Sequence, residues 1–336
     1  MKKVVTFGEV MMRLMPPGYA LFSQTDSLEL TFGGGEANTA ISLAYFGLKA
    51  SHVTRFPDNA IGKAGAQFLR RHWLDTEDIV YGGQEMGIYF LEMGAVHRSS
   101  NIVYDRSHSA FAKVEPGMFN WEKILEGADW FHFTGITPAL SQGAANACLE
   151  AAKAAKKSGI TVSMDLGYRS NLWTYGKTPQ QILPGLVAEC DVIIASKSDI
   201  LDVFKGDGRG NSEYNFSTAC NMLMEKFPHV KKVAHKKRKS VNASYNKISG
   251  KMWNGSKMLK TKKLEITFIV DRVGTGDAFA AGLIYGLMHF NDDLEALNFA
   301  TAACALKHTV VGDANMVAVE DVKQLAEGDT SGKINR

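Results

Sequence analysis

Residues 271–286, DRVGTGDAFAAGLIYG, combine a strand end, a glycine turn and a helix start. The preceding run LEITFIVD is apolar and β-branched and predicts a strand that ends at Asp271. The following AFAAGLIYGLM predicts a helix whose alanines and glycines allow close packing on a sheet. The turn GTGD, residues 274–277, is therefore expected at a helix N-terminus.

Such a turn favours an anion, because helix N-termini carry unpaired N–H groups and glycine lets the backbone approach a ligand. Asp277 lies in the same field, which we expect to favour its ionised form, and an ionised carboxylate can accept a proton from an attacking hydroxyl. An ordinary helix cap is the alternative. Two commoner phosphate motifs are absent, since Ala64 follows Lys63 in IGKAG and Asn38 replaces the last glycine in GGGEAN.

The composition is that of a globular protein. The chain has 336 residues, 45% of them hydrophobic and 22% charged, and its net charge of +3 is too near neutral to indicate nucleic-acid binding. No apolar run is long enough for a membrane span, and the start MKKVVTFGEV is typical of a first strand, not a signal peptide. The four cysteines lack a paired metal spacing, so we expect reduced, buried thiols in a cytoplasmic protein.

Apolar runs alternate with helical segments along the chain. KVVTFGEV, SHVTRF, DWFHFTG, ITVSMDL and CDVIIAS predict strands, and GGGEANTAISLAYFG, AIGKAGAQFLRRHW and SQGAANACLEAAKAAKKSG predict helices. This alternation indicates an α/β fold with a parallel sheet covered on both faces. Residues with a chemical role should then lie beyond the carboxyl ends of the strands.

Two segments, within residues 9–32 and 87–106, depart from this pattern. Both contain short pieces that alternate apolar and polar residues without an intervening helix. We predict that they form a small sheet that stands off the main one as a lid, within a single domain spanning residues 1–336. Two surface hairpins without a role are the alternative.

The segments DRVGTGDAFAAGLIYG and FGGGEANTAISLAYFG resemble the two signatures of the ribokinase-like, or PfkB-type, carbohydrate kinases. The resemblance covers nearly the whole chain, and FGEVMMRLMPPG and MDLGYRSNLW resemble the family members that act on 2-keto-3-deoxygluconate. It implies a three-layer fold with a mostly parallel central sheet, and transfer of the γ-phosphoryl group of ATP, with Mg²⁺, to a sugar acid. It also implies a homo-oligomer formed through the lid sheet.

The resemblance assigns roles position by position. Asp277 matches the catalytic base, and Gly274, Thr275 and Gly276 match the anion hole for the transferring phosphoryl group. A guanidinium fork suits a carboxylate, so two matching arginines favour an acid over a neutral sugar, although surface ion pairs are the alternative. The positions that match contacts to the sugar acid are Gly34, Tyr89, Arg106, Arg169 and Asp313.

The nucleotide side departs from the family. In ASKSD, Ser196 and Lys197 replace the usual Asn and Glu, so a charge is reversed, and only Asp199 remains as a weak metal candidate. The run HKKRK replaces a Thr-x-Arg-Glu turn; a solvated strand edge is a better interpretation of it than a nucleic-acid patch. The residues expected to contact the nucleotide are Ser196, Lys236, Arg238, Gly274 and Gly276.

Two other functions stay open on these grounds. One is a related kinase for a neutral sugar such as fructose or ribose, against which the arginines argue. The other is a degenerate, non-catalytic member that binds a sugar acid, against which Asp277 and the glycines of the turn argue.

Overall fold

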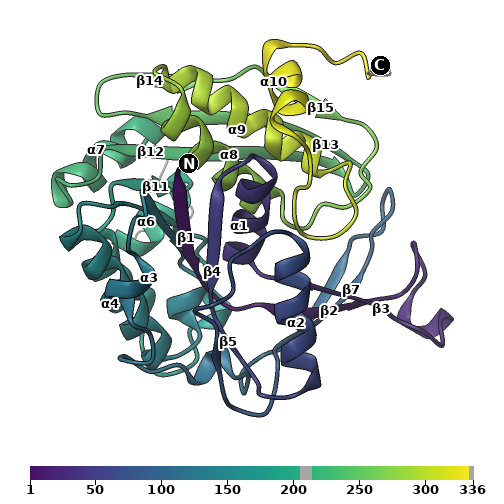
Figure 1. Ribbon diagram of the computed structural model, residues 1–336. Coiled ribbons are helices and arrows are strands. Elements are labelled where there is room, and N and C mark those ends of the chain that lie inside the picture. Colours follow the sequence, from purple (N-terminus) through teal and green to yellow (C-terminus); the bar gives the residue numbers. More distant parts are fainter. Residues whose placement is uncertain (205–213, 333–336) are drawn as a thin grey trace.

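A mostly parallel sheet lies between two layers of helices in the computed structural model, which describes residues 1–204 and 214–332 (Figure 1). The strand order is β14-β13-β12-β11-β10-β9-β1-β4, with β15 paired to β13. Strands β12 to β14 and β15 pair antiparallel, and the pairs from β12 to β4 are parallel. The strands are β1 (Lys3–Phe7), β4 (Lys49–Val53), β9 (Trp130–Thr134), β10 (Thr161–Asp165), β11 (Val192–Ile194), β12 (Lys232–Asn242), β13 (Tyr245–Trp253), β14 (Met258–Lys260) and β15 (Leu264–Ile266).

Side chains alternate between the two faces of the sheet and enter two separate cores, as buried strands require. Val4 belongs to one core, and its neighbour Val5 belongs to the other. The first core is covered by α1 (Gly35–Tyr45), α2 (Ala60–Arg71), α8 (Thr275–His289), α9 (Asp293–Lys307) and α10 (Val319–Glu327). The second is covered by α3 (Trp121–Ile124), α4 (Gln142–Lys157), α5 (Pro179–Val187), α6 (Lys197–Phe204) and α7 (Phe216–Lys226). The predicted three layers are confirmed.

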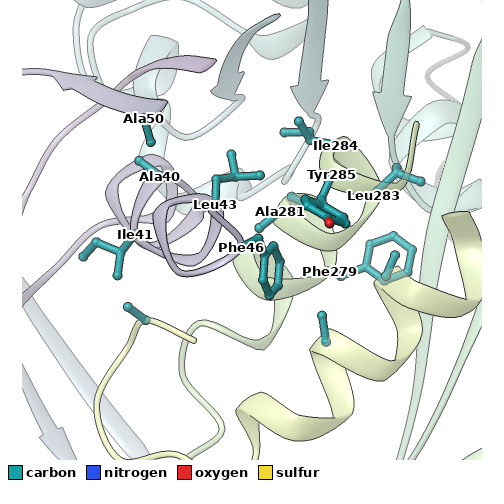
Figure 2. Packing of buried hydrophobic residues seen from close by; sticks show 14 of the residues in the cluster. Ala40, Ile41, Leu43, Phe46, Ala50, Phe279, Ala281, Leu283, Ile284 and Tyr285 are labelled. Atoms are coloured by element: carbon teal, nitrogen blue, oxygen red, sulfur yellow. The ribbon is translucent and has the colours of Figure 1, made fainter. Parts of the chain in front are cut away.

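Packing of α8 against α1 and α9 places the glycine turn. Figure 2 shows Phe46, at the end of α1, facing Tyr285 of α8, and their ring centroids lie 5.4 Å apart. A Cβ atom on Gly286 would come within 2.7 Å of the Ala296 Cα, so α8 and α9 are in backbone contact. The small residues of AFAAGLIYG are therefore required for packing, as expected from the sequence.

A separate small sheet projects from the body of the molecule (Figure 1). Its order is β3-β2-β7-β8, and its strands are β2 (Met11–Met15), β3 (Glu29–Gly33), β7 (Ile88–Glu92) and β8 (Asn101–Asp105). These are the two predicted segments, except that β3 extends one residue further. A two-stranded sheet, β5 (Arg55–Phe56) with β6 (Val80–Tyr81), lies elsewhere. The 3₁₀ helices are Phe22–Gln24, Phe111–Lys113, Thr137–Ala139 and Ser170–Leu172.

The predicted strand LEITFIVD is shorter in the structure. Only Leu264–Ile266 pairs with β13, and the chain then leaves the sheet. The Val270 and Asp271 amides donate to the His308 carbonyl instead, at 2.8 and 3.3 Å, beyond the end of α9. Just before the glycine turn, the backbone is therefore hydrogen-bonded to the end of α9 and not to a neighbouring strand.

All four cysteines are free and buried, as predicted. Within residues 1–204 and 214–332, none of the helices combines the length and the apolar character that a bilayer span requires.

Candidate active site

A cavity of about 660 Å³ opens between the small sheet and the carboxyl ends of the central strands. Its wall includes the last residues of β9, β10 and β11, which are Thr134, Asp165 and Ile194. The structure brings every candidate site residue predicted from the sequence to this one cavity. They are Gly34, Tyr89, Arg106, Arg169, Ser196, Asp199, Lys236, Arg238, Gly274, Thr275, Gly276, Asp277 and Asp313.

The N-terminus of α8 opens on this cavity. Gly274 is its N-cap, with φ of 76° in the left-handed region, and a Cβ atom there would lie 1.6 Å from the Asp313 carbonyl oxygen. Glycine is therefore required both for the backbone conformation and for the close approach. The Lys236 ammonium lies 3.4 Å from the Thr275 hydroxyl. Unpaired helix N–H groups beside a lysine form a site suited to an anion.

Asp277 lies at the floor of the cavity, where its environment differs from the sequence prediction. Removal from water raises the pKa of Asp277 to about 7; Asn38 opposes this rise, and nearby Asp165 and Asp313 add to it. The expectation that the helix field favours the ionised form was wrong, because burial among carboxylates outweighs that field. A carboxyl group with a pKa near neutral pH is suited to proton transfer.

Asn38 fixes the orientation of this carboxyl group. Its side-chain N–H donates to Asp277 Oδ2 at 2.7 Å, while its Oδ1 accepts from the Gly34 amide at 3.3 Å. From the sequence, Asn38 is notable only as the residue that replaces the last glycine of a G-x-G-x-x-G motif. Its position four residues after Gly34, on the face of α1 that meets α8, is the signal that was overlooked.

Two arginines that line the cavity differ in whether a carboxylate pairs with them. Arg106 donates from Nε to Glu9 at 2.8 Å and forms an ion pair through Nη2 at 2.5 Å, so Glu9 fixes its guanidinium. The Ser109 hydroxyl donates to the same carboxylate. Arg169 is exposed to the cavity, and no ion pair of the described residues includes it. Arg169 is thus available to bind a carboxylate, and Arg106, held in place by Glu9, lines the same cavity.

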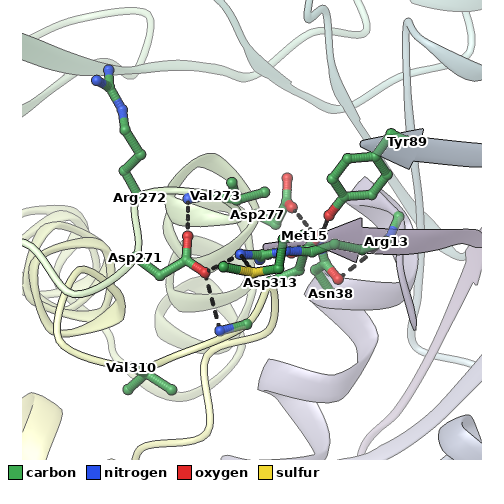
Figure 3. A network of polar contacts seen from close by, with 12 residues as sticks. Arg13, Met15, Asn38, Tyr89, Asp271, Arg272, Val273, Asp277, Val310 and Asp313 are labelled. Atoms are coloured by element: carbon green, nitrogen blue, oxygen red, sulfur yellow. Dashed lines mark hydrogen bonds and ion pairs between the residues drawn. The ribbon is translucent and has the colours of Figure 1, made fainter. Parts of the chain in front are cut away.

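Tyr89 and Asp313 belong to a buried ionic network that the sequence did not reveal (Figure 3). The Tyr89 hydroxyl donates to Asp313 Oδ2. Arg13 of β2 donates to Asp313 Oδ1 at 2.5 Å and to Asp271 Oδ2 at 2.7 Å. In MMRLM, Arg13 shares the inward face of Met11 and Met15, and this alternation was the available signal.

Hydrogen bonds at the start of α6 account for the residues that replace the family's usual Asn and Glu on the nucleotide side. Ser196 and Asp199 cap each other, since the Ser196 amide donates to the carboxylate at 2.9 Å and the Asp199 amide donates to the hydroxyl at 3.1 Å. Lys197 is not among the residues that line the cavity, and its ammonium donates to the Tyr214 carbonyl at 3.0 Å. The expected reversal of charge at the site is therefore wrong, because the lysine belongs to the α6–α7 side.

The basic run lies in β12 and is not a turn. Lys236 and Arg238 line the cavity, whereas Lys237 and Lys239 occupy the opposite face of the strand. Partial removal from water, and then the charges of Arg272 and Arg169, lower the pKa of Arg238, and all three arginines line the cavity. None of these three arginines forms an ion pair with a described carboxylate. Such a concentration of unpaired cations is suited to a polyanion.

A scan against protein-family models matches residues 1–319 to the pfkB family of carbohydrate kinases. A 2-dehydro-3-deoxygalactonokinase from Haloferax volcanii is 30% identical over 98% of both chains. A 5-dehydro-2-deoxygluconokinase from Bacillus subtilis is 28% identical over 89% of this chain and 87% of its own. The crystal structure of a 2-dehydro-3-deoxygluconokinase from Thermotoga maritima superposes with a TM-score of 0.92, at 42% identity, over 98% of this chain and 100% of its own. The predicted ribokinase-like fold and family are confirmed.

The raised pKa of Asp277 predicts a pH-dependent stability difference. The folded carboxyl group has a pKa of about 7 against an ordinary 3.8, so its ionisation destabilises the folded chain as pH rises between these values. We expect Asp277→Asn to raise the free energy of unfolding at pH 8.5, and by a smaller amount at pH 5.5. Urea unfolding at both pH values measures this; an equal gain at both would contradict the raised pKa.

Proposed function

Because the chain belongs to the pfkB family of carbohydrate kinases, we propose that it transfers the γ-phosphoryl group of ATP to a hydroxyl of 2-keto-3-deoxygluconate. The observation that carries the proposal is the combination, in one cavity, of Asp277 at the anion-binding end of α8 with the unpaired guanidinium of Arg169. The names of the Haloferax and Thermotoga relatives support a 2-keto-3-deoxy sugar acid as the substrate class. The galactonate epimer is its nearest competitor.

In the proposed reaction, Asp277 accepts the proton of the attacking hydroxyl, whose oxygen forms a bond to the γ-phosphorus while the bond to the ADP oxygen breaks. Asn38 holds the carboxyl group in place. The N–H groups of Gly274, Thr275 and Gly276 bind the oxygens of the transferring group, where negative charge must be stabilised. A pKa near 7 lets Asp277 act as a base at neutral pH.

The sugar acid is proposed to bind with its carboxylate on Arg169 and Arg106. Glu9 neutralises part of the charge of Arg106 and fixes the direction of its guanidinium group. Of these two arginines, Arg169 therefore supplies most of the unpaired positive charge. Gly34 offers backbone contact, since no side chain fits between it and the Glu9 carbonyl. Tyr89 and Asp313 bind each other and would accept or donate to sugar hydroxyls with their remaining capacity.

The nucleotide is proposed to bind along Lys236, Arg238 and Ser196. Mg²⁺ is commonly held by one or two carboxylates together with phosphates and water. Asp165 and Asp199 line the cavity and would hold it. A Mg²⁺ ion held there would neutralise phosphate charge.

The small sheet is proposed to act as a lid that excludes water from the cavity, within one kinase domain. Four free, buried cysteines support a location in the reducing cytoplasm.

A coupled assay of ADP release tests the function. We expect turnover with 2-keto-3-deoxygluconate or its galactonate epimer, and little with fructose or ribose. Asp277→Asn should lower kcat by roughly 10²–10⁴-fold while sugar-acid binding persists. Faster turnover of a neutral sugar would favour the neutral-sugar kinase, and sugar-acid binding without any turnover would favour a non-catalytic member.

Arg169→Ala tests the substrate class. Loss of a charge-assisted hydrogen bond, about 1.5–3 kcal/mol, should raise KM for the sugar acid roughly 10- to 150-fold. KM for a neutral sugar should change much less. Arg71→Ala, on the exposed end of α2, is the matched control and should leave both KM values unchanged. Equal effects of Arg169→Ala on acid and neutral substrates would contradict carboxylate binding.

We further propose that two copies associate through the outer face of the small sheet. Four directly paired apolar residues cross that face, and the two outermost, Leu30 and Val103, are 52% and 51% exposed. The row runs through Leu30, Leu14, Phe90 and Val103. An exposed apolar sheet face of this kind favours burial against a second copy.

Light scattering after size-exclusion chromatography tests this association. The wild type should elute as an oligomer, and Leu30→Glu with Val103→Glu should elute as a monomer, because the charges cannot be buried. Val241→Glu, at an exposed site on another element, is the control and should not alter the mass. A monomeric wild type would contradict the proposal.

A further inference from the structure

Arg13 lies at the centre of a buried network that joins the small sheet to the glycine turn (Figure 3). It comes from β2, its side chain is fully buried, and it forms ion pairs with Asp271 and Asp313. These partners are 258 and 300 residues away in sequence. One guanidinium thus connects three parts of the chain that the backbone does not connect locally.

Each of the two ion pairs of Arg13 is called an arm here. The first arm joins Arg13 to Asp271, three residues before Gly274. Asp271 accepts from Arg13 and from the Gly312 amide through Oδ2, at 2.7 and 3.1 Å. Its Oδ1 accepts from the Val273 amide at 3.0 Å, which fixes the Arg272–Val273 peptide, one peptide before the one that joins Val273 to Gly274. Asp271 does not line the cavity, so any effect it has on the reaction must pass through this turn.

The second arm joins Arg13 to Asp313, whose backbone lies against Gly274. Asp313 accepts from Arg13 at 2.5 Å, and its carbonyl oxygen lies against Gly274, where not even a Cβ atom would fit. Gly274 is thus held from two sides by carboxylate residues that share one guanidinium. The two terminal nitrogens of arginine allow this double attachment, which a lysine ammonium cannot reproduce with the same geometry.

The charge balance also requires Arg13. Asp271 and Asp313 are 2% and 5% exposed, and leaving them without a cation would be costly. The other buried cation nearby, Lys307, donates to the Asp271 and Val310 carbonyl oxygens, at 3.4 and 2.9 Å, and not to either carboxylate. Among the described residues, Arg13 is therefore the cation paired directly with both carboxylates.

We propose that Arg13 is a positioning residue for phosphoryl transfer, which holds the anion-binding turn in register with the small sheet. This inference rests on the proposed kinase function for its kinetic consequence. The same strand β2 contributes Met11 to the cavity wall, and its Arg13 is hydrogen-bonded to Asp271 and Asp313 on either side of Gly274 in the chain, so a displacement of the small sheet would reach the turn through these bonds. Arg13 itself is not among the residues that line the cavity and acts through Asp271 and Asp313.

Three variants separate positioning from simple stabilisation. Arg13→Met removes both arms, Arg13→Lys keeps the charge but loses the fixed fork geometry of the guanidinium, and Asp271→Asn weakens one arm without altering a cavity residue. Lys232→Met, which removes the Lys232–Asp293 ion pair at 2.5 Å far from the turn, is the control for lost stability alone. Each is measured by kcat and KM for the sugar acid, thermal unfolding, and hydrogen exchange of peptides covering residues 271–276 and 310–314.

Arg13→Met should lower kcat roughly 10²-fold, because displacement of reacting groups by about 1 Å has effects of this size. Asp271→Asn should lower kcat about tenfold and leave KM for the sugar acid within about twofold. Arg13→Lys should fall between Arg13→Met and the wild type. Both peptides should exchange faster in Arg13→Met, whereas the α4 peptide should not change.

A folded Arg13→Met with wild-type kcat, or with unchanged exchange at residues 271–276, would overturn the proposal. If Arg13→Met does not fold, Asp271→Asn decides, and an effect no larger than that of Lys232→Met would overturn it. Wild type without turnover on any sugar acid would contradict the kinase proposal, while the exchange measurement would still decide the role of Arg13.

Discussion

The backbone of Gly274 lies against the Asp313 carbonyl more closely than any other residue would permit. This contact fixes the first turn of α8 relative to the loop that carries Asp313, and it depends on packing of α8 against α9 and α1. Arg13 then ties both sides of the contact to the small sheet. The anion-binding end of a helix is thus placed at the carboxyl ends of the central strands, where open α/β sheets commonly bind ligands.

The cavity is lined both by carboxyl groups with raised pKa values and by guanidinium groups that form no ion pair with a described carboxylate. Burial raises the pKa of Asp277 to about 7 and that of Asp165 to about 6, which stores unfavourable electrostatic energy in the folded chain. Arg169, Arg238 and Arg272 have no carboxylate partners among the described residues, so they are free to compensate an anionic ligand. A sugar acid bound together with ATP would satisfy both features. Their carboxylate and phosphate groups supply negative charge to the arginines, and the sugar hydroxyl supplies a proton to Asp277.

Local patterns predicted the parts of this molecule that local physics determines. The GTGD turn, the alternating strands and helices, and the small sheet followed from period and turn chemistry in segments of about 5–15 residues. The sequence did not reveal the Arg13–Asp271–Asp313 network, because its members are up to 300 residues apart. The ionisation of Asp277 was also mispredicted, since its pKa depends on burial and on residues from α1, β10, β12 and the loop that carries Asp313. The direction of the Lys197 side chain depended on the Tyr214 carbonyl, just before α7, which no pattern around ASKSD encodes.

A crystal structure with 2-keto-3-deoxygluconate and a non-hydrolysable ATP analogue tests the central claim most directly. The account predicts one sugar hydroxyl within hydrogen-bond distance of Asp277, in line with the terminal phosphate bound at Gly274–Gly276. It also predicts the sugar carboxylate on Arg169 and Arg106. A carboxylate bound away from both arginines, or a terminal phosphate held away from the N-terminus of α8, would contradict it.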